Sequence, residues 1–230
     1  MTAEDCRRDL AAAREKLSAA AAAMIGKHRG GESDRYRAAH AQCLSLEREL
    51  ARATDDECAT EIPWPQRWDI GAPLPHVLSS GSRTFLIYNM REPDPNWDGS
   101  YANVVDPASA ALRLIAVIQF ERCIIHKFGS PNDEVLEGHP LHGRGLAAYA
   151  AHVVERSRWI ADLMKVNSVH PGYNPDSWQQ YQHYLLAFHD ETFECIARGH
   201  SRKQMLSSFP EALEMCSRSL TAGRRRPTSC

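Results

Sequence analysis

Apolar side chains recur at spacings of three and four residues over the first 54 positions, which is the pattern of amphipathic helices. The pattern predicts one helix over 3–25 and a second over about 34–54, where Ser33 or Asp34 can serve as the N-cap. Together the segments predict an antiparallel helical hairpin. A hairpin this narrow cannot bury its apolar stripes alone, so we expect it to pack on the rest of the chain or on a second copy. The stripes are Leu10, Ala13, Leu17, Ala20 and Met24, then Tyr36, Ala39, Cys43, Leu46 and Leu50.

The composition changes at Ile62-Pro-Trp-Pro65 from Ala-rich helix to a chain punctuated by Pro and Gly. Apolar runs predict strands over 84–88, 101–105 and 149–154, and one bent strand or two over 112–127. Residues 182–197 predict a long strand or a hairpin, and helices are expected after Ser157 and over 209–220. The predicted fold is α+β: a mostly antiparallel sheet with one or two packed helices, preceded by the hairpin. The expected units are the hairpin over 1–58, the α+β domain over 62–205, and a short helix with a disordered tail over 206–230.

The composition narrows the class of protein. With a formal net charge of −2 the chain shows no basic excess for nucleic acid or an anionic membrane, and no apolar run is long enough to span a bilayer. Residues 1–8 lack the pattern of a signal peptide. The seven cysteines are widely spaced and form no C-x-x-C pair, which favours free thiols in a reducing cytoplasm.

Two polar-rich stretches, 120–142 and 184–197, lie within or beside runs that predict buried strands. Burying polar groups is costly unless they are paired, so these stretches form either a structural network or a site. If 184–197 turns at Asp190-Glu191, Phe188 pairs with Phe193; if it is straight, His189 and Asp190 lie on opposite faces. In either geometry His189 is a candidate general base with Asp190 as its orienting carboxylate. The alternative is a strand end whose polar groups cap backbone amides.

Glu121 lies inside a long apolar run and is the candidate acid, because a buried carboxyl would have a raised pKa. The alternative is a Glu–Arg pair across neighbouring strands. Asn132, Asp133 and Glu134 belong to a turn and are candidate ligand-binding residues, as are His139 and His142. A divalent metal is the cofactor that imidazole and carboxylate groups would suit, although the spacing matches no standard metal motif. The candidate metal ligands are His126, His139, His142 and His189.

Several short motifs occur in order along residues 62–200: Phe128-Gly-x-Pro-Asn-Asp-Glu134, Gly138-His-Pro-Leu141 and Phe188-His-Asp-x-Thr-Phe-Glu-Cys195. As a string they resemble a group of uncharacterised bacterial proteins to which no activity is assigned. The resemblance implies that the polar stretches belong to one compact domain.

Two functional hypotheses follow. The first is a small-molecule-binding domain or enzyme with a His/Asp/Glu pocket in which His189 is the base. The second is a non-catalytic interaction module whose helical hairpin associates with itself, giving a homo-oligomer, or docks a partner, while the polar stretches only hold the fold. They differ in one expectation: an enzyme needs the polar stretches to converge around open space, whereas a module has them closed and its hairpin stripe exposed.

Overall fold

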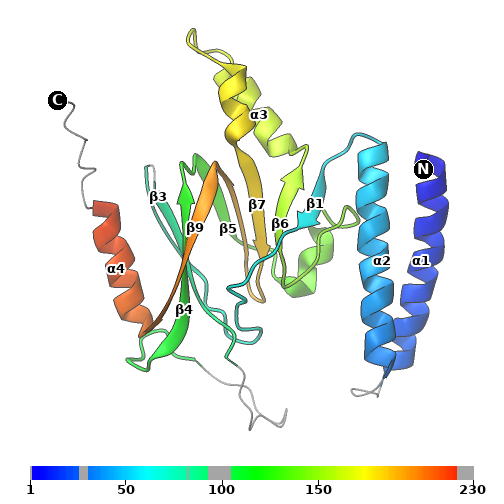
Figure 1. Cartoon of the computed structure of the whole chain (residues 1–230), viewed down its shortest axis with the longest axis horizontal. Helices are drawn as coiled ribbons and strands as arrows, with labels where there is room; N and C mark the ends of the chain where they lie inside the picture. The colour runs from blue at the N-terminus through cyan, green and yellow to red at the C-terminus, as the bar shows by residue number, and fades with distance from the viewer. Residues whose placement is uncertain (1, 26–30, 82, 93–104, 222–230) are drawn as a thin grey trace.

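The computed structural model describes residues 2–25, 31–81, 83–92 and 105–221. The chain begins with helices α1 (Ala3–Met24) and α2 (Gly31–Ala53), which lie antiparallel as predicted (Figure 1). Thr2 caps α1 in a capping box with Asp5. Leu10, Ala13 and Cys43 are buried where the helices meet, with Leu17, Leu46 and Leu50 packed around them. The apolar stripes of the two helices are therefore buried against one another.

Nine strands form two antiparallel sheets within the described residues, which confirms the α+β class. The first sheet has the order β1 (Cys58–Glu61), β6 (Ala151–Glu155), β7 (Gln182–Ala187), β8 (Thr192–Ala197), β5 (Ile125–Gly129). The second has the order β2 (His76–Ser80), β3 (Arg83–Asn89), β4 (Arg113–Glu121), β9 (Gly199–Ser207). The sheets pack face to face because alternate residues of each strand are large and apolar. The core between them includes Leu86, Tyr88, Ile118 and Phe120 from one sheet, and Tyr184, Leu186, Phe193 and Cys195 from the other.

Helices and an irregular segment cover the outer faces of the sandwich (Figure 1). Helix α4 (Phe209–Thr221) buries Phe209, Ala212 and Cys216 against β3 and β4. The other sheet is covered by the 3-10 helix η1 (Asp133–Gly138) and by the loop after it, which inserts Leu136, Leu141 and Leu146. Helix α3 (Arg158–Asn167), capped by Ser157 as predicted, and a second 3-10 helix (Pro175–Gln180) lie between β6 and β7 in the sequence.

The helical hairpin is attached to the body through α2. Arg48 donates from Nε to the Ala59 carbonyl at 2.9 Å and from Nη2 to the Gly145 carbonyl at 3.0 Å. The Gly145 amide in turn donates to Glu47 Oε2 at 3.1 Å. Further along α2, Arg52 binds both carboxylate oxygens of Glu155 on β6. The helical hairpin was expected to pack either on the rest of the chain or on a second copy, and in this structure it packs on the rest of its own chain.

For each of the two long apolar runs, the sequence allowed either one strand or two, and the structure has two in each. The run over 112–127 forms two strands, β4 and β5, separated at 122–124, where Arg122 has a φ of 49°. The segment 182–197 is a hairpin, and its turn is at His189-Asp190, one residue earlier than the predicted turn. Ala187 therefore pairs with Thr192, and Leu186, not Phe188, lies opposite Phe193. The predicted position was wrong because Phe188 donates its amide to the Glu191 carbonyl and closes the turn there.

Strands β1, β2 and β9 were not predicted from the sequence. Within β9, the stretch His200–Gln204 carries polar and charged side chains on an edge strand whose outer face is exposed, so no apolar alternation marks it. The strand predicted over 101–105, except for its last residue, lies outside the described residues, as does the tail after 221. Across the described ranges, no helix combines the length and the apolar character that crossing a membrane requires.

Candidate functional site

The two polar stretches do converge, at the turn between β7 and β8. The His189 carbonyl accepts a hydrogen bond from the Asp133 amide at 3.0 Å. The Thr192 hydroxyl donates to the Pro131 carbonyl at 2.8 Å. These bonds fix the start of η1 against the hairpin turn, so the side chains of Asp133 and His189 come from segments far apart in sequence but lie together.

A three-residue hydrogen-bonded cluster lies at this junction, and we call it the His189 cluster: Asp133, Tyr149 and His189. His189 Nδ1 lies 3.0 Å from Asp133 Oδ2 and 3.0 Å from the Tyr149 hydroxyl. The Tyr149 hydroxyl also donates to Asp133 Oδ2. The other ring nitrogen, Nε2, lies 3.8 Å from Asp190 Oδ1, beyond hydrogen-bond distance. The carboxylate that orients His189 is thus Asp133 and not the predicted Asp190.

The hydrogen bonds and charges within the His189 cluster shift the pKa values of all three members. The hydrogen bond with Asp133 raises the pKa of His189 above its ordinary value, and the charge on Asp133 raises it further. The hydrogen bond from Tyr149 holds the pKa of Asp133 below its ordinary value. Burial, together with the bond to Asp133, raises the pKa of Tyr149, so its hydroxyl stays protonated. The cluster therefore combines an ionised carboxylate with an imidazole that binds its proton more tightly than usual.

Two further features of the His189 cluster are unusual for a purely structural network. Tyr149 has a φ of 58°, a left-handed conformation that is costly for a bulky residue. Asp133 Oδ1 is buried with no hydrogen-bond partner among the described residues, and so is Glu191 Oε2, next to the turn. Burial raises the pKa of Glu191. A buried carboxylate oxygen without a partner is destabilising unless something outside the described chain satisfies it.

A second polar cluster lies on the outer face of the same sheet, centred on Glu194 of β8. His183 Nε2 lies 2.9 Å from Glu194 Oε2, and His139 Nε2 lies 3.6 Å from Glu194 Oε1. On its other side, His183 Nδ1 is 2.8 Å from the Ser157 hydroxyl, which also accepts the Ile160 amide as the cap of α3. Lys127 approaches Glu194 at 3.9 Å and lies over the ring of Trp159.

The Glu194 cluster is closed. Glu194, His183, His139 and Ser157 are each less than a tenth exposed. Burial alone would raise the pKa of Glu194, but the neighbouring imidazoles of His139 and His183 outweigh it and leave the pKa well below its ordinary value. Each carboxylate oxygen has an imidazole neighbour, so this cluster has the properties of a structural network.

The remaining predicted site residues lie apart from one another. Glu121 is exposed at the end of β4, where its carbonyl accepts the Arg198 amide beyond the carboxyl end of β8, whereas His189 precedes the amino end of that strand. The structure therefore does not bring Glu121 to His189. His126 stacks on Phe193 at 6.3 Å, and Asn132 caps η1. Glu134 is exposed.

The four candidate metal ligands have four different surroundings: Phe193 for His126, Glu194 for His139, Asp133 for His189, and a cleft beside the helical hairpin for His142. Among the residues that the structure describes, no three His, Cys, Asp or Glu side chains are grouped so that they could hold a metal ion. Sequence reasoning missed Tyr149, His183 and Glu194. Glu194 stands inside the motif Phe188–Cys195, whereas Tyr149 lies among alanines and His183 stands just before the polar-rich stretch 184–197.

Comparison with known proteins finds no match among family models, curated proteins or solved structures. Function must therefore be argued from the geometry of this chain.

Acidification is expected to destabilise the protein through His152, which is fully buried beneath the loop after η1. Its Nε2 accepts the Ala147 amide, and burial, aided by the charge of Arg48, lowers its pKa to about 4. The unfolded chain binds a proton near pH 6.5 and the folded chain near pH 4, so stability falls as the pH drops between these values. From pH 7 to pH 5 this group alone should cost about 2 kcal/mol.

Urea unfolding at both pH values measures the loss. In His152→Gln, the loss of unfolding free energy from pH 7 to pH 5 should be about 2 kcal/mol smaller than in the wild type. In His142→Gln, which changes an exposed position, the loss should equal that of the wild type. An equal loss in the wild type and in His152→Gln would contradict the assignment.

Proposed function

We propose that this protein is a small-molecule-binding protein, and an enzyme of the acid–base type, whose site is the His189 cluster. The observation that carries the proposal is the arrangement of His189 with Asp133: the carboxylate binds Nδ1 and leaves Nε2 for a substrate. An imidazole held in this way is the usual general base, because the carboxylate fixes the ring and stabilises the imidazolium that forms.

Each group in the cluster has a role that its geometry permits. His189 would take a proton at Nε2 from a substrate hydroxyl, an activated C–H or a water molecule. Its side chain is 39% exposed, so a substrate can reach it. The hydrogen bond with Asp133 raises the pKa of His189, so the imidazole is a stronger base than a free one. The unpartnered Asp133 Oδ1 would accept a hydrogen bond from a bound polar molecule, which supports binding at this place.

The helical hairpin gives less support to the alternative of a non-catalytic interaction module. That hypothesis expects an exposed apolar stripe, whereas the stripes of α1 and α2 are packed on each other and α2 is bound to the body. Self-association through α1 stays a prediction, and size-exclusion chromatography with light scattering would measure it.

The first test is whether Asp133 and His189 act as a unit. An NMR titration of the ring nitrogens should give a pKa for His189 above its ordinary value, and Asp133→Asn should lower it, because the stabilising charge is lost. Tyr149→Phe keeps the carboxylate and should change the pKa of His189 less.

The second test is binding and turnover. Thermal-shift screening with hydroxy acids, sugars and nucleosides should identify compounds that stabilise the wild type but not His189→Gln, and mass spectrometry after incubation should detect product only with the wild type. His126→Gln, which lies on another strand, is the matched control. A panel in which the wild type and His189→Gln bind the same compounds and form the same products would show that the proposal is wrong.

A further inference from the structure

A cleft opens where the helical hairpin meets the body, and we call it the hairpin cleft. Its volume is about 460 Å³, within the range of small-molecule sites. It is formed by both helices of the hairpin and by the loop after η1, which reaches toward α2 (Figure 1). The lining residues are Arg14, Leu17, His40, Cys43, Leu44, Glu47, His142, Gly143 and Leu146.

One part of the hairpin cleft is apolar. Leu17, Leu44 and Leu146 supply aliphatic side chains. Cys43 is almost fully buried, and burial raises the pKa of its thiol, so it stays neutral and adds to the apolar wall. This wall would bury an alkyl or aryl group of a ligand.

The acid in the hairpin cleft is already engaged. Glu47 is 9% exposed, and both of its oxygens are bound: Oε1 accepts from Arg14 and Oε2 accepts from the Gly145 amide, each at 3.1 Å. It is therefore a poor partner for a cationic ligand. The charge of Arg14 also offsets the negative charge of Glu47, which weakens its attraction for a ligand amine.

The hairpin cleft also contains hydrogen-bond donors that are not all used by the protein. Arg14 is 56% exposed and uses one nitrogen, Nη2, for Glu47, whereas a guanidinium has five N–H groups in a planar fork. His40 and His142 place two imidazoles in the same cleft. Gly143 has a φ of 74°, and a Cβ built there would be in van der Waals contact with Arg14 Nη2, at 3.5 Å.

We propose that the hairpin cleft binds a small organic monoanion with an apolar tail, of the class of a medium-chain carboxylate. The carboxylate would bind the fork of Arg14, and the tail would lie on the leucine wall. A single charge fits better than the double charge of a phosphate, because Glu47 already neutralises part of the charge of Arg14. This site is separate from the His189 cluster: Asp133, Tyr149 and His189 do not line it.

Isothermal titration calorimetry of the full chain with octanoate tests the proposal, with octan-1-ol, octylamine and octyl phosphate as matched ligands. Octanoate should bind with one-to-one stoichiometry and more tightly than the other three. Arg14→Gln should weaken octanoate binding about tenfold, or ~1.4 kcal/mol, because the charge is lost while the apolar wall remains. Arg7→Gln, on an exposed position of the same helix, should bind like the wild type.

Binding of octanol or octylamine as tight as that of octanoate would overturn the assignment of an anion site. Equal affinity in Arg14→Gln and Arg7→Gln would overturn the assignment to this cleft, as would no heat at millimolar octanoate. Because Arg14 also binds Glu47, circular dichroism must show that Arg14→Gln is folded. If it is not, His142→Glu replaces it: this exposed position lines the cleft, so a second carboxylate there should repel octanoate, and unchanged octanoate affinity in that variant would equally overturn the assignment.

Discussion

Gly145→Ala is expected to lower the free energy of unfolding by about 3 kcal/mol, because two costs add at this position. Gly145 has a φ of 85°, a backbone conformation that residues other than glycine rarely adopt. A Cβ built there would also lie 2.6 Å from the Ala59 carbonyl oxygen and 2.6 Å from Arg48 Cγ, closer than van der Waals contact allows. The variant must therefore move the loop, α2 or both. Thermal unfolding should show a midpoint about 6–12 °C lower.

Gly81→Ala is the matched control for this prediction. Gly81 also has a positive φ, 56°, but a Cβ built there meets no atom within 4 Å. The control should cost about 1 kcal/mol, the backbone term alone. Equal losses in the two variants would mean that contact of the new Cβ with Arg48 and Ala59 does not destabilise Gly145→Ala.

Glu194→Ala is expected to cost about 3 kcal/mol or more. Removal of the carboxylate would leave His183 without its acceptor, and His139 without the neighbouring charge, in a buried environment. The low pKa of Glu194 also means that its contribution is present at neutral pH and is lost as the pH falls below about 4. Urea unfolding at pH 7 would measure the effect.

Glu137→Ala provides the comparison, since Glu137 is exposed on η1 and its loss should change stability by less than about 0.5 kcal/mol. Glu194→Ala combined with His183→Ala should cost less than the sum of the single changes, because the two side chains form one hydrogen-bonded unit. Additive losses would contradict the interpretation of Glu194 and His183 as a single network.

The sequence predicted those elements whose own periodicity decides them. The stripes of α1 and α2, the cap Ser157 and the strand at 84–88 depend on local patterns, and the structure confirms them. Strand β9 was missed because its polar side chains lie on an exposed edge, where burial imposes no pattern. The turn at His189-Asp190 was misplaced by one residue because it lacks the Gly or Asn that usually marks such turns.

The candidate site was predicted in part. His189 and Asp133 were identified because polar residues beside apolar runs are costly to bury. Their pairing was not predicted, because it depends on a hydrogen bond from the Asp133 amide to the His189 carbonyl, and these residues are 56 positions apart in the sequence. Tyr149 was not identified, because no local residue pattern indicates its left-handed backbone conformation.

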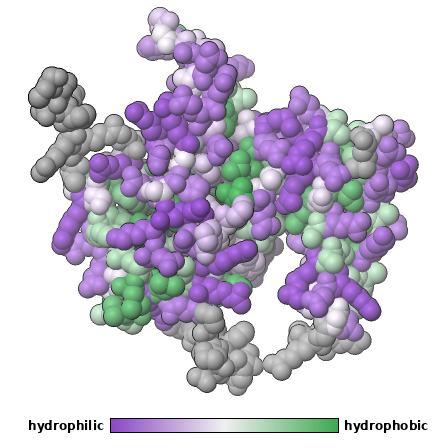
Figure 2. Space-filling model, viewed as in Figure 1, coloured by the Kyte–Doolittle hydropathy of each residue, from purple (hydrophilic) through white to green (hydrophobic). Residues whose placement is uncertain are grey.

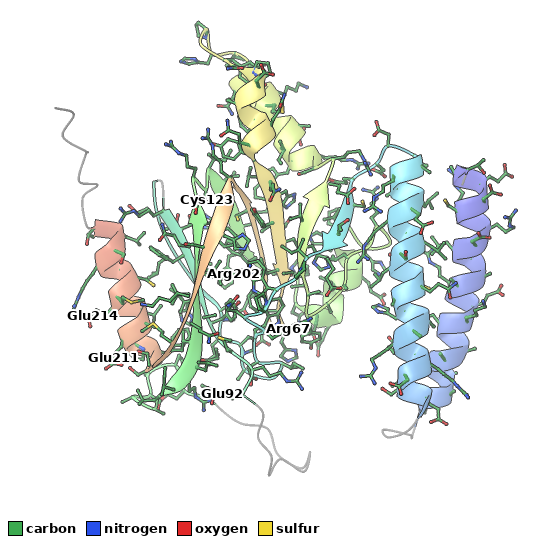
Figure 3. All side chains as sticks on the ribbon, viewed as in Figure 1. Arg67, Glu92, Cys123, Arg202, Glu211 and Glu214 are labelled. Atoms are coloured by element: carbon green, nitrogen blue, oxygen red, sulfur yellow. The ribbon has the colours of Figure 1, made fainter. Side chains whose placement is uncertain are left out.

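The side-chain view shows where the labelled residues lie on the sandwich. Cys123 lies at one end of the sandwich and Glu211 and Glu214 lie on α4, on the side away from the helical hairpin (Figure 3). Most of the face seen in Figure 2 is hydrophilic, and hydrophobic atoms reach the surface in only a few places on it.

The irregular segment between β5 and β6 has a consequence for how the chain can vary. It supplies Asp133 and Tyr149 to the His189 cluster, His139 to the Glu194 cluster, Gly145 to the attachment of α2 and His142 to the hairpin cleft. Segments without regular structure usually accept insertions and protease cleavage more readily than strands do. Here one added or deleted residue would shift the register of four separate sets of contacts at once. This segment should therefore vary in length less than a connection of its kind normally does.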